Sequence, residues 1–203
     1  MPRMTQTPKG RVLVSVTDKT GLEKFKPLAD AGWEFISTGG TATALKNAGI
    51  ESIPIEKLTD WPEMMGGRLK TLHPKVHGGI LAIRDDPAHM QALAQHAIGL
   101  IDVVVVNLYA FEEKPTIENI DIGGPALLRG AAKNAAFVAP IVDPADYDAV
   151  IAELLETGTT SEELRKKLAI KVFKMTAGYD AAIAKWMEEQ DAHGNPFLKT
   201  EAH

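Results

Sequence analysis

Short runs of apolar, mostly β-branched residues alternate along the chain with longer stretches in which apolar positions recur every three or four residues. The short runs predict five strands, at 11–16, 33–37, 51–55, 101–108 and 137–142. The longer stretches predict helices at 17–31, 41–48, 87–98, 125–134, 146–156 and 160–187. Alternation of this kind favours an α/β fold: a parallel sheet flanked by helices in three layers, Rossmann-like, with the last helix as a C-terminal extension.

Three local signals refine this prediction. The run Ile101–Leu108 is apolar on both faces, which is typical of an interior strand of a parallel sheet. Pro54 removes a ladder donor from the third strand, so that strand is expected at an edge. Thr160 and Glu163 have the spacing of a capping box, and the last helix is therefore expected to open there.

The composition is that of an ordinary globular protein, with 45% hydrophobic and 24% charged residues among 203. We expect one domain at 9–190, with flexible tails at 1–8 and 191–203. The absence of cysteine excludes disulfides and thiolate chemistry. No secretion signal opens the chain and its longest apolar run is too short for a bilayer, so we expect a cytoplasmic protein that does not bind membranes.

The formal net charge is −5, which argues against binding to nucleic acid, because such binding needs an extended basic face. One segment is nevertheless basic and flanked by glycines, Gly66–Ala82. Its Arg68 and Lys70 suit a phosphate or carboxylate ligand, and apolar residues among the bases argue against a merely solvated loop. His73 and His77 are separated by a proline and lack a carboxylate partner, so no metal site is predicted.

Polar side chains collect where the predicted strands end. In parallel α/β sheets, ligands bind beyond the carboxyl ends of the strands. The residues that follow three of these strands are small, hydroxyl-bearing or basic, and they comprise Ser15, Lys19, Thr38, Gly39, Gly40, Thr41, Asn107 and Tyr109. The turn STGGT between a strand and a helix could bind phosphate through backbone N–H groups, although a plain turn with a threonine cap has the same sequence pattern.

A third polar cluster precedes a predicted helix. Asp121 and the pair Gly123–Gly124 come just before it, and Arg129 and Lys133 lie four residues apart on one helical face. An acid beside lysines keeps its charge, and so do the lysines. A helix cap with two surface cations is the alternative interpretation of this cluster.

Together the segments SVTDKTGL, STGGT, GGRLKTLHPKVHGGILA, NLYAF and IDIGGPALLRGAAKN resemble the inosine monophosphate (IMP) cyclohydrolase domain in sequence, order and spacing. That domain is the N-terminal half of the bifunctional purine-biosynthesis proteins. The resemblance implies a methylglyoxal synthase-like fold. It also implies dehydrative ring closure of 5-formamidoimidazole-4-carboxamide ribotide (FAICAR) to IMP, the last step of de novo purine biosynthesis, without a metal or organic cofactor.

The resemblance also assigns roles to residues at motif positions. The implied catalytic group is Lys70, Thr71, Tyr109, Asp121 and Lys133. The implied substrate-binding residues are Ser15, Lys19, Thr38, Gly39, Gly40, Thr41, Arg68, Asn107, Gly123 and Gly124. Lys133 and Asp121 are expected to act on the formyl group and its leaving oxygen. Lys70 and Tyr109 are expected to orient the carboxamide and relay its proton.

The sequence departs from the family in two ways. The family's usual protein continues into a transformylase domain that lies beyond this sequence, and because its dimer forms largely through that half, the resemblance allows a homodimer without requiring one. Gly130 and Ala135 stand where alanine and histidine are usual, and both adjoin Lys133.

Three other functions remain open from sequence. A phosphate- or nucleotide-binding regulatory domain of the same fold, as in carbamoyl phosphate synthetase, would keep STGGT but lose the reacting groups. A methylglyoxal synthase would need a carboxylate base beside a small phosphate pocket, and the sequence around Asp121 does not match one. A non-enzymatic nucleotide-binding module would show affinity without turnover.

Overall fold

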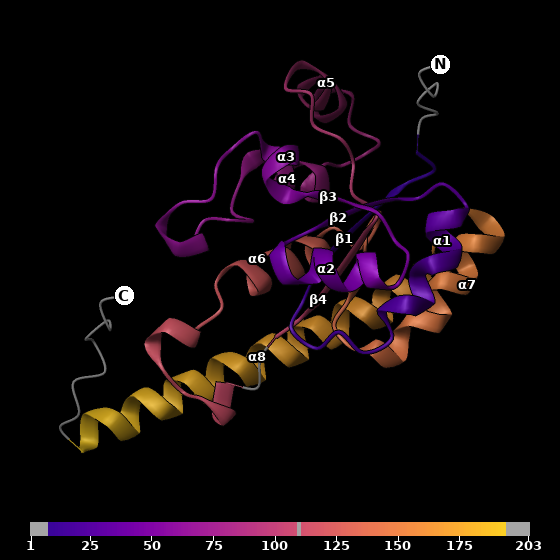
Figure 1. Ribbon diagram of the computed structural model, residues 1–203. Helices are drawn as coiled ribbons and strands as arrows, with labels where there is room; N and C mark the ends of the chain where they lie inside the picture. The colour runs from indigo at the N-terminus through magenta and orange to yellow at the C-terminus, as the bar shows by residue number, and fades with distance from the viewer. Residues whose placement is uncertain (1–7, 109–110, 194–203) are drawn as a thin grey trace.

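The computed structural model describes residues 8–108 and 111–193, and it contains a five-stranded parallel sheet flanked by helices (Figure 1). The strands are β1 (Arg11–Val16), β2 (Glu34–Ser37), β3 (Ser52–Pro54), β4 (Val103–Asn107) and β5 (Ala139–Ile141). They lie in the order β3-β2-β1-β4-β5 and every neighbouring pair is parallel. The predicted α/β class, the edge position of β3 and the interior position of β4 are confirmed. The domain boundaries 9–190 and the flexible tails stay predictions.

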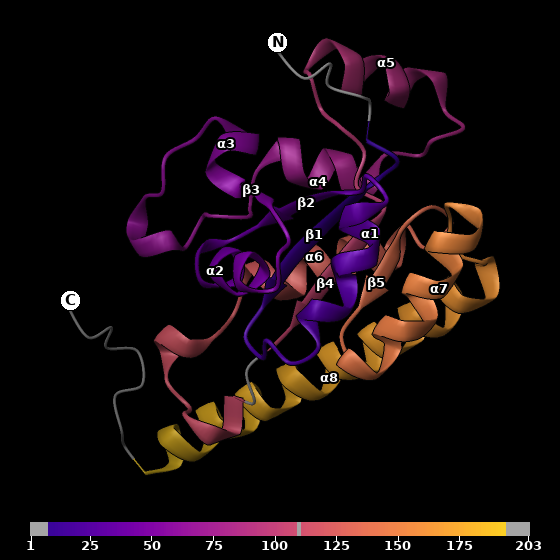
Figure 2. The ribbon, with the colours of Figure 1, turned by 45° about the vertical axis from the view of Figure 1, so that its right-hand side comes forward.

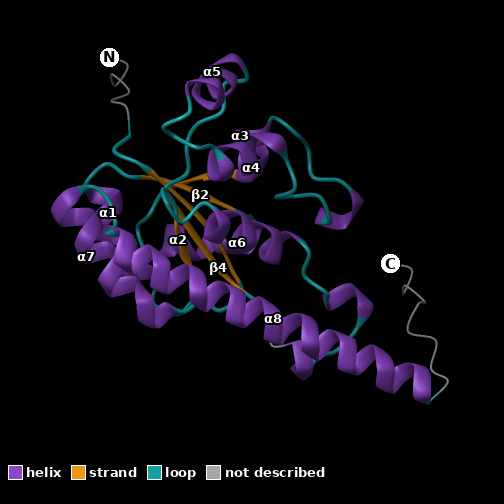
Figure 3. Cartoon of the chain, turned by 180° about the vertical axis from the view of Figure 1, so that it is seen from behind, coloured by secondary structure: helices purple, strands orange, loops and turns teal. Residues whose placement is uncertain are grey.

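Helices connect and cover these strands. The α-helices are α1 (Lys26–Asp30), α2 (Gly39–Asn47), α3 (Ile55–Thr59), α4 (Pro74–Leu81), α5 (Pro87–Gln95), α6 (Gly123–Lys133), α7 (Tyr147–Thr157) and α8 (Glu162–Ala192). The 3-10 helices are η1 (Leu22–Phe25), η2 (Met65–Gly67), η3 (Phe111–Glu113), η4 (Ile117–Asn119) and η5 (Pro144–Asp146). Helix α8 is the longest, and it continues well past the edge of the sheet, as the C-terminal extension was predicted to do (Figures 1 and 3).

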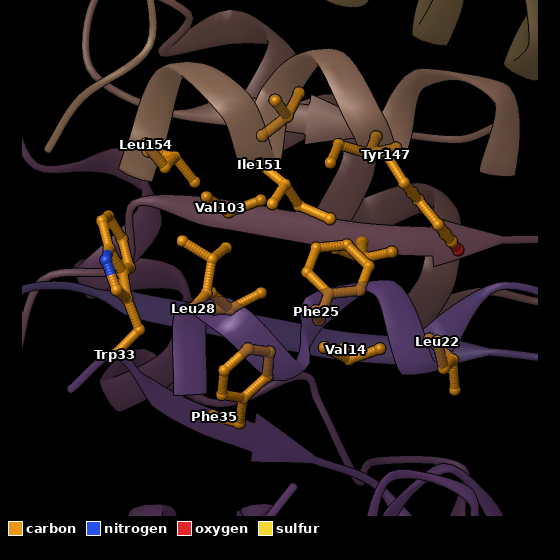
Figure 4. Close-up of a cluster of buried hydrophobic side chains, with 14 of the residues drawn as sticks. Val14, Leu22, Phe25, Leu28, Trp33, Phe35, Val103, Tyr147, Ile151 and Leu154 are labelled. Carbon is orange, nitrogen blue, oxygen red and sulfur yellow. The ribbon is translucent and has the colours of Figure 1, made fainter. Parts of the chain in front are cut away.

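One face of the sheet packs against η1, α1, α2 and α7 (Figure 2). Its core combines strand valines with aromatic side chains, and Phe25 lies edge-on to Tyr147 with ring centroids 4.8 Å apart (Figure 4). Phe35 and Trp33 close the same cluster toward α2 and the start of β2. Burial of apolar surface stabilises such a core by about 25 cal/mol per Å².

The other face packs against α3, α4, α6 and α8 (Figure 3). Val76 and Ile80 of α4 meet Leu127 and Leu128 of α6 in this second core cluster. Thr71, shortly before α4, approaches Gly123 at the start of α6, and Lys70 approaches Gly39, just after β2. This arrangement carries the basic segment to the edge where the strands end.

Part of the basic segment is helical, although the sequence pattern predicted no helix there. Residues 74–81 form α4, and His73 caps it by accepting a hydrogen bond from Lys75 N–H at its Nδ1. Pro74 occupies the first helical position, where the missing N–H costs nothing and the fixed φ favours the helix. The proline therefore begins a helix here, whereas the sequence suggested that it interrupts one.

The predicted N-cap of α8, Thr160, is also wrong by one residue. Ser161 is the N-cap, and its Oγ accepts from Leu164 N–H at 3.2 Å. Thr160 is buried and its carbonyl accepts from Arg165, so it serves a different contact. Glu153 of α7 accepts a hydrogen bond from the Ser161 N–H. In a capping box, the glutamate three residues after the N-cap would accept this bond.

Several predicted bounds shift as well. Helix α5 ends at Gln95 and not at Ile98, since Ala97 adopts a left-handed φ of 51°. Helices α2 and α6 each start two residues earlier than predicted, at Gly39 and Gly123. The glycines predicted to precede these helices are therefore inside their first turns.

Candidate functional site

The predicted site lies at the carboxyl end of the sheet, where β1 and β2 lead into hydroxyl-bearing residues. Ser15 Oγ and Thr38 Oγ1 share a hydrogen bond of 3.1 Å, and both side chains are partly exposed. Thr41 is 2% exposed, and its hydroxyl accepts from Val16 N–H and donates to the Val16 carbonyl. The Thr41 hydroxyl is thus used by the fold, whereas Ser15 and Thr38 can reach a ligand.

Helix α2 directs its amino end at this edge. Its N-cap Thr38 makes no side-chain hydrogen bond to the helix, and its hydroxyl pairs with Ser15. Gly39 and Gly40 are exposed, so a ligand can approach the N–H groups of the first turn. Helix amino ends carry partial positive charge and free N–H donors, which suits them to anions. This end of α2 can hold a phosphate group.

Asn107, at the end of β4, fixes the turn that follows β1. Its Oδ1 accepts from the N–H groups of Thr17 and Asp18 at 2.6 and 3.0 Å, and its Nδ2 donates to the Asp18 carbonyl at 2.9 Å. Lys19 folds back so that its Nζ donates to the Val16 carbonyl. Burial is the main cause that lowers the pKa of Lys19, and neighbouring Asp18 opposes it. The turn is therefore preorganised beside the amino end of α2.

Lys70 reaches the same helix end from the basic segment. A Cβ placed on Gly39 would lie 3.3 Å from Lys70 Nζ. The same Nζ is 3.3 Å from Glu63 Oε2 and 3.9 Å from Glu56 Oε1. Sequence reasoning missed these two carboxylates, because nothing in their spacing links them to Lys70. They hold the ammonium group beside the candidate phosphate position.

A pocket of about 220 Å³ opens on the outer side of Lys70. Trp61 and His73 stand on its wall with ring centroids 6.3 Å apart, and Glu56 and Glu63 complete its polar lining. Trp61 is 52% exposed, so one apolar ring of the lining is open to solvent. This pocket gives solvent and small molecules access to the lysine.

Arg68 does not join the cluster at α2. Its guanidinium pairs with Glu118, with one N···O distance of 2.6 Å, and its side chain is 61% exposed. Glu118 belongs to η4, which precedes the segment that carries Asp121. Arg68 therefore links the basic segment to that segment in this structure.

Thr71 and Asp121 meet at the amino end of α6. Thr71 is buried, and its Oγ1 would lie only 2.5 Å from a Cβ on Gly123. Asp121 Oδ1 accepts from Gly124 N–H at 2.8 Å. A Cβ on Gly124 would lie 2.3 Å from Asp121 Oδ2, so both glycines are required by close approach. The predicted residues Thr71, Asp121, Gly123 and Gly124 thus form one compact group.

Burial changes the chemistry of Asp121. Desolvation raises the pKa of its carboxyl group, and hydrogen bonds from the N–H groups of Gly124 and Gly123 oppose the shift. A carboxyl group whose pKa lies above its ordinary value holds a proton more readily and is better suited to general acid–base catalysis. Asp121 is therefore the residue in this group that is best placed to move a proton.

One predicted catalytic residue, Lys133, stands apart from this group. Lys133 is the last residue of α6 and is exposed, about 15 Å along the helix axis from Gly123 at 1.5 Å per residue. Within the described part of the chain, no hydrogen bond or ion pair joins Lys133 to Lys70, Thr71 or Asp121. Tyr109 lies outside the described residues.

His77 is a partly buried histidine of α4 that faces α6. Desolvation is the main cause that lowers its pKa, and a hydrogen bond with the Thr71 backbone opposes the shift. Its Nε2 is buried without a hydrogen-bond partner among residues 8–108 and 111–193. A Cβ on Gly130 would lie 3.9 Å from its Nδ1, which places the ring against α6. The His77 ring therefore packs against α6 near the Thr71 backbone.

Metal ions and membranes make distinct demands on the described residues, 8–108 and 111–193. No group of three or more histidine, cysteine, aspartate or glutamate side chains there is arranged to hold a metal ion. None of the described helices has the length and apolar character to cross a membrane.

Comparisons with known proteins agree with this geometry. The profile of the MGS-like domain family matches residues 21–126, and that of the AICARFT/IMPCHase bienzyme family matches residues 131–202. The bifunctional purine biosynthesis protein PurH of Streptococcus suis (strain 05ZYH33) is 53% identical over 196 residues. That of Streptococcus pneumoniae (strain P1031) is 54% identical over 196 residues. Each alignment covers 92% of this chain but 38% of the relative.

A solved structure is also similar. The crystal structure of ForH superposes with a TM-score of 0.79 and 38% sequence identity, covering 86% of this chain and 97% of that one. The first family profile matches more than half of the chain, and the PurH alignments extend over nearly all of it. The chain therefore belongs to the MGS-like domain family and is homologous to the N-terminal part of PurH.

Proposed function

We propose that this chain is an IMP cyclohydrolase that closes the ring of FAICAR with loss of water. The observation that carries the proposal is the convergence of Lys70, Thr71 and Asp121 between the amino ends of α2 and α6. Homology to PurH supports the same reaction, and the chain spans 38% of the length of the PurH relatives described above. Purine biosynthesis would place this work in the cytoplasm.

The reaction is a condensation that neither oxidises nor reduces the substrate. The carboxamide nitrogen of FAICAR attacks the formyl carbon, a C–N bond forms, and the former formyl oxygen leaves as water. An amide nitrogen is a weak nucleophile, so the reaction needs positioning and proton transfer. No step requires a metal or an organic cofactor.

Each part of the site can serve one requirement. The amino end of α2, with Ser15, Thr38 and Lys19, would hold the ribose phosphate. Lys70 would stabilise charge that develops near the carboxamide. Asp121, with its raised pKa, would deliver the proton with which the oxygen leaves. The group of Thr71 and the two glycines would shape the space around the base.

The test follows ultraviolet absorbance as the purine ring forms in purified protein mixed with FAICAR, with a metal chelator present and no folate. Lys70→Ala should lower kcat at least about a hundredfold while circular dichroism and Tm stay close to wild type. Lys57→Ala, which removes an exposed lysine from α3, is the matched control. Wild-type turnover by Lys70→Ala contradicts the assignment.

A second function is favoured by the position of Lys133 at the far end of α6. If closure of the ring needs this lysine at the substrate, the chain would bind the nucleotide without converting it. Isothermal titration calorimetry with IMP, run beside the absorbance assay, separates the two functions. Binding without conversion of FAICAR supports a regulatory or binding domain.

A further inference from the structure

Helix α8 contacts the segment that carries Asp121. Tyr179 of α8 is 8% exposed, and its hydroxyl accepts from Asp121 N–H at 2.8 Å. The same hydroxyl lies 3.4 Å from the carbonyl of Asn119 and donates to it. A phenolic hydroxyl can donate one hydrogen bond and also accept one. The Tyr179 hydroxyl does both, because it donates to the Asn119 carbonyl and accepts from the Asp121 N–H.

The ring of Tyr179 also holds the chain that follows β4. Phe111, the first residue of η3, meets Tyr179 edge-on with ring centroids 6.3 Å apart. Trp186, two turns further along α8, meets Phe111 in the same manner at 5.5 Å. One helix therefore contacts both the segment after β4 and the segment before α6.

Asp121 belongs to no helix or strand, so its geometry depends on these contacts. Its carboxylate is fixed by Gly124 N–H of α6 and its own N–H by Tyr179 of α8. Two anchors on different elements define where the carboxylate points. A buried N–H without a partner is costly, so loss of the hydroxyl would favour local opening of this segment.

We propose that Tyr179 is a positioning residue, whose hydroxyl fixes the backbone of Asp121 so that the carboxylate faces the amino end of α6. The inference rests on the proposed function, in which Asp121 moves a proton. Sequence reasoning missed Tyr179 because an aromatic residue on a long helix has the pattern of an ordinary core position. The two residues are separated by 58 positions in the sequence, and no local pattern indicates that they touch.

The test is Tyr179→Phe, which keeps the ring against Phe111 and removes the hydroxyl. We expect kcat for FAICAR to fall about tenfold to a hundredfold, because a displaced catalytic group lowers the rate, and KM to stay within about twofold. Amide hydrogen exchange in the segment 119–122 should become at least about fivefold faster. The matched control is Tyr147→Phe, since Tyr147 is buried on the opposite face of the sheet.

Exchange and turnover separate failure of this inference from failure of the proposed function. An inactive wild-type protein overturns the proposed function, and the exchange measurement then still tests the anchor. An active wild type with unchanged kcat or unchanged exchange in Tyr179→Phe overturns the inference. An equal loss of kcat in Tyr147→Phe also overturns it.

A second variant separates the hydroxyl from the packing of the ring. Phe111→Leu removes the edge-on ring contact and keeps the hydroxyl, so exchange in 119–122 should remain as slow as in the wild type. Faster exchange in Phe111→Leu would show that ring packing, not the hydroxyl, holds the segment, and it would overturn the inference.

Discussion

Gly123 has little room for a side chain beside Thr71. A Cβ there would lie 2.5 Å from Thr71 Oγ1, well inside normal contact distance. Gly123→Ala must therefore displace Thr71 from the amino end of α6. We expect kcat/KM for FAICAR to fall at least about a hundredfold, since displaced catalytic groups are costly, with a loss of about 1–3 kcal/mol in unfolding free energy. Steady-state kinetics and urea denaturation measure the two effects.

A result near wild type for Gly123→Ala would mean that Thr71 is not needed where it lies. Gly40→Ala is a useful comparison for the free energy of unfolding alone, because no atom lies within 4 Å of a Cβ at that position. It adds the same methyl group at another first-turn glycine. The comparison thus separates crowding at Thr71 from a general effect of alanine in a first turn.

Residue identities in the site were predictable, but several of their contacts were not. Ser15, Thr38 and Lys70 lie at one edge because parallel strands end together. Asn107 and Thr41, predicted to touch substrate, bind the backbone near the end of β1. Such partners are far apart in sequence, and only the register of the strands brings them together.

At the scale of the element, α6 contains a second glycine whose surroundings differ from those of Gly123. A Cβ on Gly130 would lie 3.6 to 3.9 Å from its nearest neighbours Ile80, Leu81 and His77, which is ordinary contact. Gly130→Ala should therefore stabilise the protein by up to about 1 kcal/mol through helix propensity. Thermal unfolding should show a rise of about 2–4 °C for a chain of this size. A lower Tm would contradict this prediction.

The end of α6 is joined to α4 by a buried amide. Asn134 Nδ2 donates to the carbonyls of Ile80 and Ala82 at 2.7 and 2.9 Å. Asn134→Ala leaves both carbonyls without this donor, so we expect a loss of about 1–3 kcal/mol in unfolding free energy. Urea denaturation measures it, with Asn47→Ala on the exposed end of α2 as control. Equal stability of the two variants would argue against the bridge.

Element types were predicted better than element ends. The strands were recognisable from their apolar runs, whereas α4 was missed because Pro74 was interpreted as an interruption. The N-cap of α8 is Ser161 and not Thr160. Glu153 accepts from the Ser161 N–H and Arg165 donates to the Thr160 carbonyl, so groups that a capping box would use are bound by other side chains. Helix ends depend on side chains from neighbouring elements, and local spacing does not contain that information.

At the scale of the molecule, the buried carboxyl of Asp121 links stability to pH. Burial raises the pKa of Asp121 above its ordinary value of 3.8, so the protonated carboxyl group stabilises the folded state. This contribution to the free energy of unfolding is fully present below pH 3.8, and it is lost as the pH rises through the pKa that Asp121 has in the folded protein. Asp121→Asn resembles the protonated form at every pH. It should be more stable than wild type at pH 7.5, with a smaller difference at pH 4.5, and it should lack turnover.

Denaturation in urea at the two pH values measures this difference. Asp85→Asn, at an exposed position, controls for the change in net charge. An Asp121→Asn protein that is less stable than wild type at pH 7.5 would show that the charged carboxylate supports the fold. The prediction would then be wrong.

The three-layer arrangement followed from the alternation of strands and helices, but the order of the strands did not. Local pattern cannot reveal that β1 pairs with β4 as well as with β2. The homodimer allowed by the resemblance and the cytoplasmic location stay predictions.

The position of β1 in the middle of the sheet has a consequence for synthesis of the protein. β1 leaves the ribosome before β4, so one of its edges stays unpaired until β4 emerges, a delay set by the separation of 90 positions between Thr17 and Asn107. At about 5–20 residues per second, that delay is roughly 5–20 seconds. During this interval a valine-rich strand is open to association with other nascent chains. Slower translation or crowded polysomes should therefore increase aggregation of this chain before its candidate site can assemble.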